Sequence, residues 1–127
     1  MASPITKKLK IGTIGELLVQ LRLLQHDVQA APPLRDSGHD LIAIKGGIFK
    51  TIQVKTTTIG RVDRPKMSTM YDILALVSLR GHDSIIQLDK SEIYLIRKEE
   101  VSFSNVGDIP AKFLLAEGRI KDLFASA

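Results

Sequence analysis

Apolar residues near the start of the chain follow a helical spacing. Between residues 13 and 26 they recur at intervals of three and four positions, at Ile14, Leu17, Leu18, Leu21 and Leu24. This spacing places them on one face of an amphipathic helix. We therefore expect a helix over residues 13–26. A short strand should follow within 27–31 and end at Pro32-Pro33, because proline cannot continue a strand ladder.

Two short runs rich in aliphatic and β-branched residues, 41–44 and 48–54, flank Gly46-Gly47. This pattern predicts a β-hairpin, because glycine adopts the positive φ angles of a two-residue turn at little cost. Antiparallel pairing through that turn sets Asp40 opposite Gln53. Gln53 and Lys55, two positions apart, share one face of the strand, while Val54 points into the opposite layer.

The second half of the chain carries further extended segments. Residues 71–79 are almost wholly apolar, as expected of a strand covered on both faces, and 85–88 and 92–96 are further strand candidates. Residues 56–70 are polar and basic and predict a long loop. Residues 110–124 predict a closing helix whose inward side chains are Phe113, Leu114, Ile120 and Phe124. The expected fold is α/β, with a central mixed β-sheet flanked by helices in a single domain over residues 1–127.

Composition excludes several kinds of functional site. The chain has 44% hydrophobic and 25% charged residues and no cysteine, which excludes a disulfide framework and a thiolate zinc site. No ligand spacing joins the three histidines His26, His39 and His82. No apolar run is long enough to span a bilayer, so a cytoplasmic protein without membrane contact is expected. Glycine motifs for a nucleotide cofactor are also missing.

Charge is distributed unevenly along the chain. The net charge is +4, but residues 1–66 hold 11 Lys and Arg against 5 Asp and Glu, whereas residues 67–127 hold 7 against 9. A cationic excess concentrated in one half suits a face that binds nucleic-acid phosphates. The candidate DNA contacts are Lys7, Lys8, Lys10, Arg61, Arg64 and Lys66, although a solvated basic surface would have the same composition.

The predicted hairpin gathers a carboxylate, an amide and an ammonium at one end. The oxygen atoms of Asp40 and of the Val54 carbonyl suit a hard divalent cation such as Mg²⁺, for which Mn²⁺ would substitute. Lys55 cannot be a ligand. Beside a bound metal it would hold or deprotonate an attacking water, or stabilise negative charge in the transition state of phosphodiester hydrolysis.

Three motifs together carry a resemblance to a known group of enzymes: the stretches 12–17, 38–44 and 52–57. They resemble the PD-(D/E)XK nuclease superfamily, near archaeal-type Holliday junction resolvases and group I intron-associated endonucleases. The resemblance implies a DNA endonuclease with Glu16, Asp40, Gln53 and Lys55 as catalytic residues. It also implies Glu16, Asp40, Gln53 and Val54 as metal ligands. Gln53 stands where many members have an acidic residue, which keeps a ligand oxygen but removes one negative charge.

Other interpretations of the same residues stay open at this point. Thr13 and Glu16 match a capping box, Asp40 fits a turn, and Lys55 fits a solvated strand end. The chain could cut a four-way junction by shape or a defined duplex sequence, or it could be an inactive nuclease-fold module that binds DNA. Cutting two strands with one site per chain favours a homodimer. Its apolar patch is expected on residues 71–79 or on the C-terminal helix.

Overall fold

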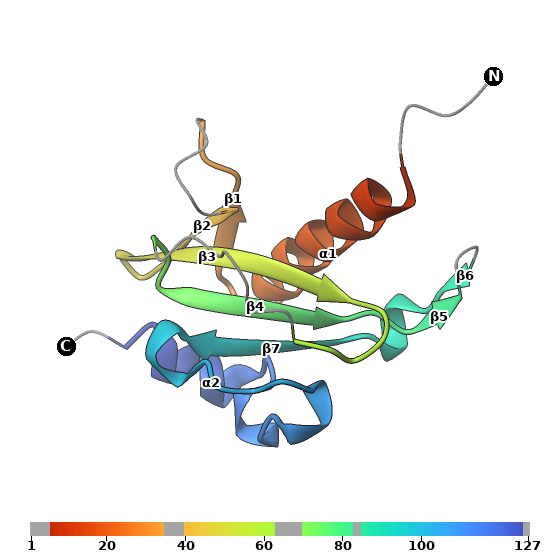
Figure 1. The fold of residues 1–127 in the computed structure, drawn as a ribbon. Helices are drawn as coiled ribbons and strands as arrows, with labels where there is room; N and C mark the ends of the chain where they lie inside the picture. The colour runs from red at the N-terminus through yellow and green to blue at the C-terminus, as the bar shows by residue number, and fades with distance from the viewer. Residues whose placement is uncertain (1–5, 35–39, 63–69, 83–84, 126–127) are drawn as a thin grey trace.

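The computed structural model describes residues 6–34, 40–62, 70–82 and 85–125 (Figure 1). Its elements are α1 (Lys7–Leu24), β1 (Gln29–Ala31), β2 (Leu41–Lys45), β3 (Ile48–Thr57), β4 (Ile73–Ser78), β5 (Gly81–His82), β6 (Ile85–Ile86), β7 (Glu92–Arg97) and α2 (Glu117–Leu123). Four single turns of 3-10 helix lie at Leu88–Lys90, Lys98–Glu100, Val106–Asp108 and Ala111–Phe113.

Five strands form the central sheet, in the order β1-β2-β3-β4-β7. The pairs are antiparallel except for β3 and β4, which run parallel, so the sheet is mixed. This confirms the expected α/β class with a central mixed sheet. The short strands β5 and β6 pair only with each other and project from one end of the sheet (Figure 1).

Each face of the sheet has its own core. On one face, α1 and α2 pack through residues such as Leu23 and Ile120. On the other face, the cover comes from Val62, Tyr71 and the segment from Val101 to Leu114. Side chains of β4 alternate between the two cores, and all six of its residues are buried. The expectation of a strand covered on both faces is therefore confirmed.

The hairpin follows the predicted register, with Leu41 opposite Ile52 and Ile42 opposite Thr51. Gly46 and Gly47 close it with φ angles of 57° and 84°, which residues that have a Cβ rarely adopt. The second strand is longer than predicted. It continues to Thr57 because its far half pairs with β4 up to Ser78, so the expected loop begins later.

Both predicted helices have different bounds in the structure. Helix α1 begins at Lys7 rather than at residue 13, because Thr6 caps it by accepting a hydrogen bond from the Leu9 N–H. Its first two turns hold three lysines, and their two apolar residues, Leu9 and Ile11, are too few to form an apolar stripe.

The prediction of one closing helix over 110–124 is wrong, because only α2 is an α-helix in this segment. Leu114 and Leu115 instead pair with the outer edge of β7, where the Leu115 N–H donates to the Ile93 carbonyl at 2.8 Å. This contact satisfies backbone groups of an edge strand, which a helix at the same position would leave unpaired.

Neither expected dimer patch is exposed. The apolar side chains of β4 and those of Ile120, Leu123 and Phe124 all lie in the cores of the same chain. Within the described residues, no helix is long and apolar enough to cross a membrane.

Candidate active site

Asp40 lies immediately before β2 and extends the hairpin by one residue. Its N–H donates to the Ile52 carbonyl at 2.9 Å. Its Oδ2 accepts two hydrogen bonds, from the Val54 N–H at 2.8 Å and from Gln53 Nε2 at 3.1 Å. The first bond holds the backbone of Asp40, and the other two hold its carboxylate. Asp40 therefore lies where the pairing of β2 with β3 stops and β3 continues alone. The predicted proximity of Asp40 and Gln53 is therefore present.

The Val54 carbonyl faces the same open edge of β3. In a strand, the N–H and C=O of one residue point to the same side and those of the next residue point to the other. The Ile52 carbonyl and the Val54 N–H face Asp40, whereas the Thr51 and Thr57 carbonyls accept bonds on the β4 side. The Val54 carbonyl consequently points beside the Asp40 carboxylate, beyond the first residue of β2.

Glu16 approaches this point from α1. It lies in the middle of that helix, so the capping-box interpretation with Thr13 is wrong; Thr6 is the N-cap. Burial raises the pKa of the Glu16 carboxyl, and the negative charge of Asp40 raises it further. The negative charge of Asp40 therefore disfavours ionisation of Glu16.

Gly15 allows α1 to lie this close to β3. A Cβ at this position would collide with the Oγ1 of Thr56. The helix is therefore in van der Waals contact with the strand one residue before Glu16, which a larger residue would prevent. A glycine inside an otherwise helical pattern is the sequence signal for such a close approach.

Glu16 and Lys55 line the same groove although they approach from opposite faces of the sheet. Val54 packs in the core beneath α1, whereas Leu76, the register partner of Lys55, packs in the other core. The groove measures about 670 Å³ and passes around the open edge of β3. Side chains of both layers meet there because β2 no longer covers that edge.

Three of the candidate DNA contacts also line the groove: Lys7, Lys8 and Arg61. Lys10 is exposed on the same helix but does not line it. Arg64 and Lys66 lie outside the described residues, as does His39. The groove is therefore lined by several cations and by the carboxylate of Glu16, and Asp40 is hydrogen-bonded to Val54, another of its lining residues. The groove is also lined by Thr56, Thr57 and Thr58, beside Lys55. The sequence patterns do not predict these three as site residues.

The donor atoms of this site fit a hard divalent cation. Glu16 and Asp40 supply carboxylate oxygens, Val54 supplies a carbonyl, and Gln53 keeps its Oε1 outside the hydrogen bond to Asp40. Mg²⁺ favours such all-oxygen sets. Within the described part of the chain, no group of three His, Cys, Asp or Glu residues gathers. Any metal at this point would therefore depend on the amide and the carbonyl in addition to the two carboxylates.

Comparison with known proteins gives a likeness in structure alone. No family model and no curated protein matches the sequence. A solved structure titled as a bacterial homing endonuclease, I-Ssp6803I, matches with a TM-score of 0.62 and 19% identity. The match covers 98% of this chain and 96% of that one. The chain has the fold of a solved homing endonuclease. At this identity the likeness establishes a shared α/β fold over nearly the whole chain.

Proposed function

We propose that this protein is a metal-dependent DNA endonuclease of the PD-(D/E)XK type that hydrolyses phosphodiester bonds. The observation that carries the proposal is the convergence of Glu16, Asp40, the Val54 carbonyl and Lys55 at the open edge of β3. A groove that holds the Glu16 carboxylate, the Lys55 ammonium and further cations, with the Asp40 carboxylate bound to Val54 beside it, suits a phosphodiester substrate. The fold shared with a solved endonuclease supports the same conclusion.

Glu16, Asp40, Gln53 Oε1 and the Val54 carbonyl would hold the cation. Bound there, Mg²⁺ or Mn²⁺ would polarise the scissile phosphate and promote ionisation of an attacking water. Asp40 has the most restricted position of the four groups, because three hydrogen bonds orient it. The raised pKa of Glu16 supports a cation as well, because positive charge between the two carboxylates would relieve their repulsion.

Lys55 supplies the remaining chemistry. Its ammonium would orient the attacking water for in-line displacement and stabilise the negative charge that develops on the phosphate oxygens. Lys7, Lys8 and Arg61 would bind phosphates on either side of the scissile one, because they rim the same groove.

The substrate is duplex or branched DNA. One chain has one such site, so cutting both strands of a duplex favours a homodimer. The homing endonuclease with the same fold favours a defined duplex sequence over a four-way junction. An inactive module that binds DNA is the second candidate, because Gln53 Nε2 already holds Asp40 by a hydrogen bond that needs no cation.

Cleavage assays with Lys55→Ala test the proposal. Labelled four-way junction, linear duplex and genomic DNA are each incubated with the protein in Mg²⁺, in Mn²⁺ and in chelator. We expect metal-dependent cutting of one substrate, reduced about 100- to 1,000-fold in Lys55→Ala, with DNA binding retained. Lys50→Ala is the matched control, since Lys50 lies on β3 outside the groove. Metal-independent binding without product from any substrate would contradict the enzyme and favour the inactive module.

A further inference from the structure

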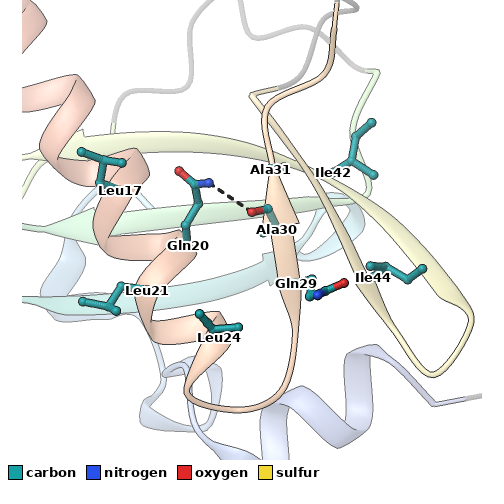
Figure 2. Close-up of a pocket in the computed structure, with 9 residues that line it drawn as sticks. All are labelled: Leu17, Gln20, Leu21, Leu24, Gln29, Ala30, Ala31, Ile42 and Ile44. Carbon is teal, nitrogen blue, oxygen red and sulfur yellow. Dashed lines mark hydrogen bonds between the residues drawn. The ribbon is translucent and has the colours of Figure 1, made fainter.

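Aliphatic side chains are exposed on α1, where this helix lies beside the edge strand β1, and on β2 at the far side of β1 (Figure 2). Leu17, Leu21 and Leu24 of α1 each expose more than half of their surface, and Ile42 of β2 exposes 37%. Together with Ile44 they line a shallow depression of about 570 Å³. We call the three leucines of α1, which point away from the sheet, the aliphatic face.

The aliphatic face is suited to apolar side chains and not to DNA. Among the described residues that line the depression, none is charged, whereas phosphate binding needs cations. The cations gather around the catalytic groove instead. An incoming strand is also disfavoured, because Gln20 Nε2 donates to the Ala30 carbonyl at 3.1 Å and so occupies an acceptor on the edge strand (Figure 2).

We propose that a second copy of this chain covers the aliphatic face, with the two α1 helices antiparallel about a twofold axis at Leu21. A twofold interface must be complementary to itself. Leu17 and Leu24 lie four and three residues on either side of Leu21, almost symmetrically. In an antiparallel pair, Leu21 therefore meets its own copy while Leu17 of one chain meets Leu24 of the other.

The exposed area supports a partner of this size. The exposed fractions of the three leucines amount to roughly 300 Å² of apolar surface, more than a third of the about 800 Å² that each partner buries in a stable interface. The surrounding parts of α1, β1 and β2 would supply the remainder as a rim. A surface of this extent on one monomer commonly marks an interaction site.

The choice of a second copy rests on the proposed function, in which a single-site chain must cut two strands. Glu16 directly precedes Leu17, so α1 has both the site residue and the aliphatic face. Pairing through α1 would place the two catalytic grooves on either side of the shared helix pair. Each groove would then reach one strand of the same duplex.

Light scattering of the full chain after gel filtration tests the interface. We expect a dimer at micromolar concentration, and Leu21→Glu should weaken it at least 30-fold, roughly the effect of losing one central interface residue. Leu9→Glu is the matched control, because Leu9 lies on the same helix, is 59% exposed against 56% for Leu21, and does not line the depression. A monomeric wild-type protein, or equal dimers in both variants, would overturn the proposal.

Cross-linking tests the same interface without a new charge. The chain has no cysteine, so Leu21→Cys introduces a single thiol beside the proposed axis. A short bis-maleimide should join two copies of Leu21→Cys and not of Leu9→Cys, and equal yields would contradict the interface. A wild-type dimer without cleavage would refute the nuclease alone. Cleavage of both strands by a monomer would refute the interface alone.

Discussion

Two clusters of charged side chains in this protein differ in how completely they are paired. In the first, Arg119 is only 5% exposed and donates to the Glu100 carboxylate at 2.7 Å, to the Asp122 carboxylate at 3.3 Å and to the Leu95 carbonyl at 2.9 Å. In the second, the Glu16 carboxylate has the negative charge of Asp40 near it, which disfavours ionisation of Glu16.

The pKa values of the two glutamates move in opposite directions. Burial acts to raise the pKa of Glu100, but hydrogen bonds from Arg119 and from the Arg97 N–H, with the charges of both arginines, lower it overall. At Glu16, burial and Asp40 both raise the pKa. A cluster that satisfies its own charges stabilises a fold, whereas one that leaves them opposed is suited to a cation from outside.

The largest effect on stability is expected at the paired cluster. Arg119→Met should cost about 3–5 kcal/mol of unfolding free energy, because it leaves Glu100 and the Leu95 carbonyl without their buried partner. The guanidinium also stacks 4.5 Å from the centroid of the Phe113 ring. Urea unfolding at pH 7 measures the change.

The control for this variant is Lys121→Met. The Lys121 ammonium pairs with exposed Glu117 on the same helix, so its loss should change stability by less than about 0.5 kcal/mol. Ionised Glu100 stabilises the fold above pH 4.5, the ordinary pKa of a glutamate. This stabilisation is lost as the pH falls through the lowered pKa of Glu100. If the difference in unfolding free energy between Arg119→Met and wild type stayed the same in strong acid, the pairing of Arg119 with ionised Glu100 would not be its cause.

Asp40→Asn is expected to affect activity strongly and stability little. The amide oxygen can still accept the hydrogen bond from the Val54 N–H, so the local structure should persist, but one ligand charge is lost. Cleavage should fall at least about 100-fold, equivalent to about 2.7 kcal/mol. Asp72→Asn is the control, since the Asp72 carboxylate accepts similar bonds from Thr51 of β3 and does not line the groove. Equal losses in the two variants would indicate a structural aspartate.

Gln53→Glu should make stability more dependent on metal. The new carboxylate cannot donate to Asp40, so the metal-free protein should lose about 1 kcal/mol. The added negative charge should tighten Mg²⁺ binding about tenfold. Melting temperatures with and without Mg²⁺, together with a calorimetric titration, measure both effects. An unchanged titration would remove Gln53 from the set of metal ligands.

Glu16→Gln is expected to have the smallest effect on stability, and it should raise the stability whereas Arg119→Met and Gln53→Glu lower it. Its raised pKa means that ionised Glu16 costs folding free energy, and this cost appears as pH rises through that pKa. In chelator at pH 7, Glu16→Gln should therefore melt higher by roughly 2 °C, or about 0.5 kcal/mol. The gain should disappear in acid, and Mg²⁺ should stabilise the variant less than wild type. A lower melting temperature in chelator would show that Glu16 stabilises the fold.

Local patterns predicted the parts of the fold that depend on neighbours in the chain. The glycine pair at 46–47 and the alternation around it determined the hairpin and its register, including the proximity of Asp40 and Gln53. The uninterrupted apolar run at 71–79 determined a strand buried on both faces. These features depend on side-chain period and turn geometry, which are properties of short segments.

Tertiary contacts decided the remainder. Leu114 and Leu115 pair with the edge of β7 instead of continuing a helix, because that edge needs backbone partners. The aliphatic spacing in 13–26 predicted a buried helix face, yet Leu17 and Leu21 are exposed because the sheet covers only the side of α1 that contains Leu18 and Val19. Glu16 meets Asp40 only because Gly15 allows the helix to contact β3 at Thr56. Sequence therefore determined which residues could form the site, and packing between distant segments decided that they meet.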